Sequence, residues 1–303
     1  MTALLSTALN VTAPLAPALA GRAAFAAFVR PAGRSRARPA EAAVMAGAAT
    51  GRLRVDGVSV ATYRWGEGSR PVLLVHGWSS RAAKLSGFVG PLREAGATVV
   101  SFDAPGSGAS GGRAVNIRQL REIIGLLHEQ HGPFEAVIAH SFGALGTFFA
   151  LREGVVADRV VALGPIADFD YPLDRFAQGM RVSGAVRRAM RRHVETRLFP
   201  GRPGIWDRLA ATHIPEEIRA RILVVHDVDD DVAEVAQGRA LAAAHHGRAR
   251  LVETRGLGHR RILHDPEVIA AAARFAVAGE VADLPQPAGG VDVAAAAGAV
   301  GHR

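Results

Sequence analysis

Short apolar segments alternate with stretches of helical periodicity along most of this chain, and this alternation constrains the fold more than any other feature. The apolar segments have the length of strands and end mostly at glycine, proline or charged residues; they are Val72–Val75, Thr98–Phe102, Ala136–Ala139, Val160–Leu163, Ile222–Val225 and Ala249–Val252. Several are apolar on both faces, as buried parallel strands are. Helical periodicity fills the intervals, for example over Ile117–Leu127. Repeated strand–helix units predict an α/β fold, with a mostly parallel sheet covered by helices on both faces.

The same pattern divides the chain into three parts. Residues 51–280 predict one domain that opens with an antiparallel hairpin, Leu53–Val55 and Val58–Trp65. Residues 1–50 predict an N-terminal extension and linker, with one helix around Leu19–Val29 that could dock on the domain and an Arg-Pro-rich linker at Arg30–Pro39. Residues 281–303 are mostly small residues and predict a disordered tail.

One segment of the domain, about 166–213, breaks the alternation. It has helical patterns but no strand, and it lies between two consecutive strands, one ending near Leu163 and the next starting at Ile222. In sheets of this kind ligands bind beyond the carboxyl ends of the strands. We therefore expect a small helical lid inserted above those strand ends.

The formal net charge of +8 does not by itself indicate a nucleic-acid partner. The positive charges are almost all arginine and are spread along the chain, with Lys84 the only lysine. One dense cluster occurs, at Arg187, Arg188, Arg191 and Arg192. We expect it to be the solvated face of an amphipathic lid helix, partly paired through Arg191 and Glu195. A nucleic-acid or membrane-surface binder that uses this cluster is the alternative.

The sequence also excludes some kinds of site and bears on membrane insertion and location. It contains no cysteine, so disulfides and thiolate sites are excluded. No apolar run reaches the roughly 18–20 residues that a spanning helix needs, so we expect no stable membrane insertion. Ala18-Leu19-Ala20 resembles a signal-peptidase site, but no basic residue precedes it and polar residues interrupt the apolar stretch before it. We therefore expect a cytoplasmic protein.

The strongest functional signal is a serine on a sharp turn between a buried strand and a helix. Ser141 follows the strand ending at His140, and small residues, Ala139 and Gly143, stand two positions away on either side. A tight strand–turn–helix elbow strains the serine backbone and lifts its hydroxyl above the sheet, so those neighbours must lack bulk. The pattern therefore indicates a nucleophile.

Two further segments follow neighbouring strands. Val72–Val75 runs into His76-Gly77-Trp78, and Phe102 runs into a glycine-rich loop that begins at Asp103. We interpret Asp103 as a residue of a tight structural turn. His76 and His226, at strand ends, are expected to be structural, and His245-His246 has no acidic partner at metal-ligand spacing, so no metal site is expected.

An acid and a base can be supplied by later strand ends. Four aspartates, Asp227, Asp229, Asp230 and Asp231, follow the strand Ile222–Val225, and any one of them could accept a histidine N–H. His259 lies on the glycine-rich loop Gly256-Leu257-Gly258 just after the last strand, which could bring an imidazole back over the sheet.

These residues resemble the α/β-hydrolase superfamily from about Leu53 to Ala278, through the His-Gly strand end, the Asp103 loop, the serine elbow and the Gly-x-Gly-His loop. The resemblance implies a Ser-Asp-His order, with Ser141 as nucleophile, Asp230 as orienting acid (Asp229 is next) and His259 as base. It also implies an oxyanion hole formed by the backbone N–H groups of Trp78 and Phe142. One elbow glycine is replaced here by Ala139.

The function implied is a serine hydrolase of the carboxylesterase or acyl-hydrolase type. It would cleave an ester, thioester or amide bond of a small-molecule acyl substrate through an acyl-enzyme and would need no cofactor. A nucleic-acid partner is not expected. The alternative is a ligand-binding or scaffold protein that has the same fold but no turnover.

Overall fold

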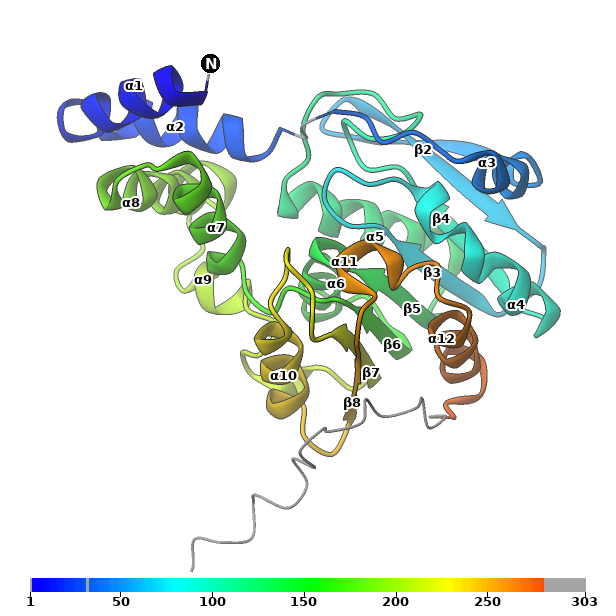
Figure 1. The fold of residues 1–303 in the computed structure, drawn as a ribbon. Coiled ribbons are helices and arrows are strands. Elements are labelled where there is room, and N and C mark those ends of the chain that lie inside the picture. Colours follow the sequence, from blue (N-terminus) through cyan, green and yellow to red (C-terminus); the bar gives the residue numbers. More distant parts are fainter. Residues whose placement is uncertain (1, 31–32, 281–303) are drawn as a thin grey trace, which may run out of the picture.

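The computed structural model describes residues 2–30 and 33–280, and they form an eight-stranded sheet flanked by helices (Figure 1). The strands are β1 Ala49–Val55, β2 Val58–Trp65, β3 Pro71–Val75, β4 Thr98–Phe102, β5 Phe134–His140, β6 Ala157–Leu163, β7 Arg221–Asp227 and β8 Ala249–Thr254. Their order is β1-β2-β4-β3-β5-β6-β7-β8. The hairpin β1–β2 joins the sheet antiparallel to β4, and the pairs from β4 to β8 are parallel. The predicted α/β architecture is confirmed.

Alternate residues of the central strands supply two apolar cores, one on each face of the sheet. On β3, Leu73 and Val75 belong to the core that includes the helices α5 (Ile117–His131) and α6 (Phe142–Arg152). Val72 and Leu74 belong to the core with α12 (Pro266–Ala278) and α4 (Val89–Glu94). The helix α10 (Val235–Ala244) packs beside β7 and β8. Both faces are covered, which explains why these strands are apolar throughout.

The segment between β6 and β7 contains short helices and no strand. These are α7 Asp170–Met180, α8 Gly184–His193, η2 Val194–Leu198, α9 Ile205–Arg208 and η3 Pro215–Glu217. The expected ion pair between Arg191 and Glu195 is not formed. Arg191 instead pairs with Asp170 and stacks over Trp206, whose indole N–H donates to Glu195.

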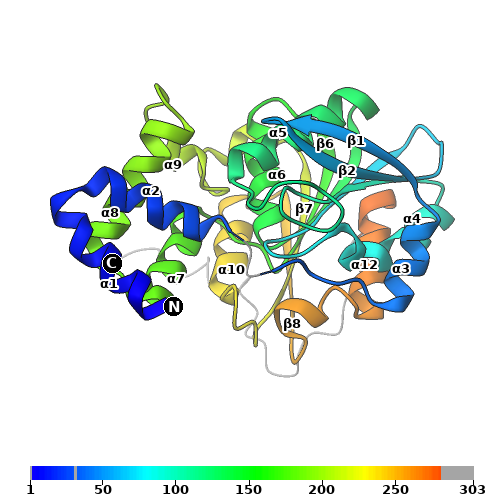
Figure 2. The same ribbon diagram turned by 90° about the horizontal axis from the view of Figure 1, so that it is seen from above.

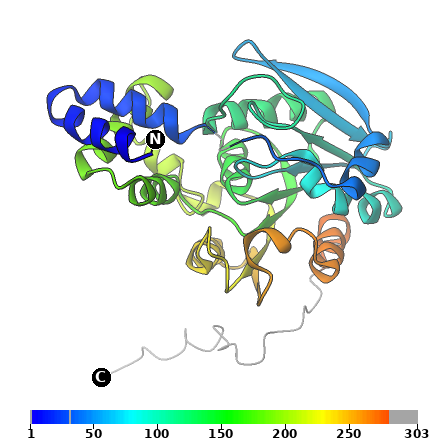
Figure 3. The same ribbon diagram turned by 45° about the horizontal axis from the view of Figure 1, so that its top comes forward.

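The N-terminal extension contains more structure than the single helix expected there. Two helices, α1 (Thr2–Leu15) and α2 (Pro17–Phe28), pack on α8 and with it form a helical layer at one end of the molecule (Figures 1, 2 and 3). The approach is close, because a Cβ added at Gly21 would lie 2.3 Å from the Ala189 carbonyl oxygen. The polar residues that interrupt the apolar pattern here do not end the helix. Ser6 Oγ and Asn10 Nδ2 donate to the Arg181 carbonyl and so fasten α1 to the segment between α7 and α8.

A third helix, α3 (Pro39–Ala46), fastens the chain to the sheet domain before β1. Its buried Glu41 accepts hydrogen bonds from Lys84 Nζ at 2.9 and 3.0 Å, and the Val44 carbonyl accepts one from Trp65 Nε1. Among the described residues, none of the helices is both long and apolar enough to span a membrane. The tail predicted at 281–303 lies outside the described residues.

Candidate active site

Ser141 stands on the turn that joins β5 to α6, at the carboxyl edge of the sheet. Its backbone has φ 56° and ψ −124°, a strained conformation for a residue with a Cβ. The following helix starts so close to β3 that a Cβ at Gly143 would lie 2.6 Å from the His76 carbonyl oxygen. The small residue at this elbow position is therefore a steric requirement of the helix start.

The structure brings Ser141, His259 and Asp230 together from three different strand ends. Ser141 Oγ lies 3.0 Å from His259 Nε2, and His259 Nδ1 lies 2.7 Å from Asp230 Oδ2. A carboxylate can only accept, so Nδ1 carries the proton, and Nε2 is free to accept the serine O–H. The arrangement can therefore draw the proton from the Ser141 hydroxyl.

The four competing aspartates have different partners. Asp227 is buried and accepts from Thr254 Oγ1 and the Leu257 amide, which fixes the loop that carries His259. Asp229 accepts from the Gly256 amide of the same loop. Asp231 is exposed. Asp230 alone of the four is hydrogen-bonded to the His259 ring.

Asp230 is held as a carboxylate by its surroundings. Burial acts to raise its pKa, but hydrogen bonds from His226, His259 and the Ala233 amide outweigh burial and hold the pKa of Asp230 far below its usual range. One oxygen, Oδ1, accepts from the amides of Val232 at 2.9 Å and Ala233 at 2.8 Å, which leaves Oδ2 for the imidazole.

Two supporting residues have no clear signal in the sequence. Gly164, at the end of β6, lies against the Asp230–His259 pair, and an added Cβ there would come within 3.2 Å of Asp230 Oδ2. His226 lies 3.4 Å from the same oxygen, and its Nε2 donates to the Ala233 carbonyl. The one hint in the sequence is that both residues stand at the ends of strands, where site residues are expected.

Two other histidines lie beside the site and stay neutral. Burial, together with the neighbouring His259, lowers the pKa of His140 to about 3. Its Nε2 contacts the His259 carbonyl oxygen at 2.9 Å, and its ring packs on the His259 ring. Burial likewise lowers the pKa of His76, whose Nε2 accepts from the Ala104 amide. His140 therefore contacts the backbone of His259, and His76 fixes the start of the loop after β4.

The segment after β3 runs directly beside Ser141. A Cβ at Gly77 would lie 2.9 Å from Ser141 Cβ, so the next residue, Trp78, is also close to the serine. The rings of Trp78 and Phe142 pack edge to face with centroids 4.9 Å apart. Phe142 is the first residue of α6, where backbone N–H groups have no partner within the helix.

The Asp103 loop has a structural role. The buried carboxylate of Asp103 accepts from Tyr63 Oη at 2.7 Å and from the amides of Ala82 and Ala109 at 2.8 Å each. These bonds join the Asp103 loop to β2 and to the segment that follows β3. Within the described part of the chain, no group of three or more His, Asp or Glu side chains is placed to hold a metal ion.

Next to Ser141, Phe142 belongs to a connected group of aromatic side chains that we call the aromatic cluster: Phe28, Trp78, Phe142, Phe169, Phe176 and Trp206. Successive ring centroids in it lie 4.9 to 6.0 Å apart. Ser141 is only 4% exposed. The cluster draws on α2 and α7 as well as the sheet domain, and Phe28 is the member that α2 contributes.

Comparisons with known proteins agree with this fold. A model of an alpha/beta hydrolase family matches residues 72–272, more than half of the chain. An esterase of Pyrococcus furiosus is 17% identical with a TM-score of 0.60, over 82% of this chain and 96% of that one. A monoacylglycerol lipase of Paleococcus ferrophilus is 21% identical with a TM-score of 0.56, over 73% of this chain and 99% of that one.

A Rhodococcus esterase is 16% identical with a TM-score of 0.53, over 77% of this chain and 98% of that one. At these identities the solved structures show the fold alone. No curated protein matches the chain. The family model, which covers most of the sheet and its helices, establishes that this chain belongs to the alpha/beta hydrolase family.

Proposed function

We propose that the protein is a serine hydrolase of the carboxylesterase or acyl-hydrolase type, which cleaves ester, thioester or amide bonds through an acyl-enzyme on Ser141. The observation that carries the proposal is the pair of contacts at His259, 3.0 Å to Ser141 Oγ and 2.7 Å to Asp230 Oδ2. A nucleophile, a base and a buried carboxylate in this order activate a hydroxyl at neutral pH.

In the proposed reaction, His259 transfers protons while the other groups stabilise charge or form the acyl bond. His259 Nε2 takes the proton of Ser141 as Oγ attacks the acyl carbon, and Asp230 stabilises the imidazolium. The amides of Trp78 and Phe142 donate to the oxyanion. His259 then gives the proton to the leaving group. A water molecule, deprotonated by His259, attacks the acyl carbon. As the bond to Ser141 Oγ breaks and the acid leaves, His259 returns the proton to Oγ.

The surroundings of Ser141 favour an apolar acyl group. The aromatic cluster includes Phe142, the residue after the serine. Its members Phe169 and Phe176 come from the segment 166–213, which we propose to act as a lid over the serine together with α2. Aromatic walls bind acyl chains by burial of apolar surface. The similar esterase and lipase structures are consistent with ester substrates.

The almost complete burial of Ser141 favours a second candidate, a protein that keeps the fold but binds a ligand without turnover. A small fluorophosphonate probe followed by a graded series of p-nitrophenyl esters separates the two. Hydrolase function predicts that Ser141 is labelled and that at least one ester turns over, both lost in Ser141→Ala. Absence of labelling and of turnover on every ester, in folded protein, would favour the second candidate.

A further inference from the structure

The N-terminal helices present an apolar surface to solvent as well as to the protein. On α1, Leu9 and Ala13 are buried, whereas Leu4, Val11 and Leu15 are 78%, 62% and 84% exposed. Val11 and Leu15 are four residues apart, and Leu4 is seven before Val11, so all three lie on one outer stripe. The helix has no charged residue. Exposed apolar side chains gathered on one helix face commonly mark an interaction surface.

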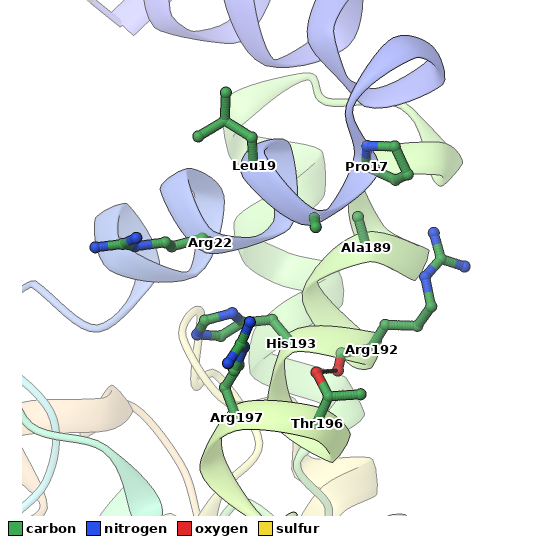
Figure 4. A pocket seen from close by; sticks show the side chains of 9 residues that line it. Pro17, Leu19, Arg22, Ala189, Arg192, His193, Thr196 and Arg197 are labelled. Atoms are coloured by element: carbon green, nitrogen blue, oxygen red, sulfur yellow. Dashed lines mark hydrogen bonds between the residues drawn. The ribbon is translucent and has the colours of Figure 1, made fainter.

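A further exposed leucine lies on α2, beside a groove. Leu19, 60% exposed, lines a groove of about 750 Å³ between α2 on one side and α8 with η2 on the other (Figure 4). Leu15 lies two residues before Pro17, which also lines the groove. The groove further contains Arg22, Arg192 and Arg197. Leu19 and three arginines therefore line one groove, and Leu15 lies at its end in the sequence.

Within residues 2–30 and 33–280, the arginines of this groove have no ion-pair partner. Among the described residues, no acidic side chain forms an ion pair with Arg22, Arg192 or Arg197, whereas the nearby Arg187 and Arg191 are paired with Asp170. In the sequence no Asp or Glu precedes Glu41. Burial and the charges of Arg197 and Arg22 also lower the pKa of His193, which lines the same groove. The unpaired positive charge of the groove favours an anionic partner.

We propose that Leu15, Leu19, Arg22, Arg192 and Arg197 form a docking surface for an anionic lipid bilayer. The leucines would enter the interface between head groups and acyl chains, and the arginines would contact lipid phosphates, a combination that a bilayer satisfies over a broad area. A second copy of this chain fits less well, because a two-fold contact would bring the same unpaired arginines together. The inference does not depend on hydrolytic activity.

Sedimentation of the full chain with vesicles tests the proposal. We would compare vesicles of phosphatidylcholine with vesicles in which part of the lipid is phosphatidylglycerol. Binding is expected to the second kind, and high salt should weaken it because the arginine contribution is electrostatic. The pair Arg192→Gln/Arg197→Gln should lower the partition coefficient about 25-fold, at roughly fivefold for each arginine. Leu15→Ser should lower it roughly tenfold.

Matched variants control for charge and for exposed apolar surface. Arg219→Gln/Arg274→Gln removes two exposed arginines from elsewhere, and Val156→Ser removes an exposed aliphatic side chain far from α1. Both should bind anionic vesicles as the unaltered chain does. Melting temperatures of all variants confirm that each is folded.

Several results would overturn the proposal. One is failure of the folded full chain to bind anionic vesicles. Another is binding that the control pair reduces as much as the groove pair does. A dimer by light scattering that Leu15→Ser dissociates, without vesicle binding, would assign the surface to a second copy. Retention by an acidic protein without vesicle binding would assign it to a protein partner.

Discussion

Asp230→Asn is a sharp test of the proposed site because the structure fixes how the new amide must lie. Oδ1 of Asp230 accepts two backbone N–H groups, from Val232 and Ala233. An amide nitrogen cannot accept a hydrogen bond, so the asparagine oxygen must stay on this side. The NH₂ group then takes the place of Oδ2, 2.7 Å from His259 Nδ1.

This orientation reverses the tautomer of His259. Nδ1 must now accept from the amide, so the proton moves to Nε2, which faces Ser141 Oγ at 3.0 Å. A protonated Nε2 cannot take the serine proton. Loss of the correct tautomer in such a triad lowers kcat by about 10⁴-fold, equivalent to about 5 kcal/mol of transition-state stabilisation. The fold should persist because both backbone hydrogen bonds are kept.

The assay is kcat/KM on the best p-nitrophenyl ester, with the melting temperature measured on the same samples. Asp231→Asn is the matched control, since it removes an exposed carboxylate from the next residue, and Asp229→Asn tests the neighbouring candidate. Both should stay within about tenfold of the unaltered chain, because neither carboxylate meets the imidazole. If Asp229→Asn or Asp231→Asn were the most damaging of the three, the reasoning would be refuted.

Three further predictions concern the turn at Ser141, the attachment of α3 and the proposed acyl pocket. Gly143→Ala should destabilise by roughly 1–3 kcal/mol in urea unfolding, because its Cβ meets the His76 carbonyl; Gly90→Ala, with open space around it, should not, and equal effects would contradict the steric argument. Glu41→Gln should cost about 2 kcal/mol at pH 7. Burial opposes ionisation of Glu41, yet Arg38 N–H and Lys84 lower its pKa, so this stability should disappear as pH falls below about 4; a pH-independent difference would be inconsistent. Phe169→Leu should shift acyl-length preference about tenfold in an ester series with phosphonate labelling unchanged; an unaltered preference would exclude it from the acyl pocket.

The sheet was predictable because its signals are local. Both faces of the central strands are buried, so these strands are apolar at every position. Strands such as Ile222–Val225 therefore stand out from the polar and charged residues around them. The strained turn at Ser141 was predictable for the same reason, since the small flanking residues and the strand–helix junction are close together in the sequence.

The N-terminal helices were only partly predictable because their support comes from distant residues. Thr7, Asn10 and Thr12 weaken the apolar pattern of α1, yet Asn10 bonds the backbone near Arg181 and so stabilises the helix in place. The contact of Phe28 with Trp78 likewise joins residues far apart in sequence. The spacing of the aspartates alone could not identify the acid. Its identity depends on which loop N–H groups donate hydrogen bonds to each carboxylate.

The most direct test of the central claim is the site of acylation during turnover. The protein would be mixed with an excess of its best p-nitrophenyl ester, quenched rapidly in acid and digested for peptide mass spectrometry. We predict one acyl group per chain, on Ser141, together with loss of both acylation and turnover in Ser141→Ala. An acyl group on another residue, or turnover that persists in Ser141→Ala, would contradict the proposed mechanism.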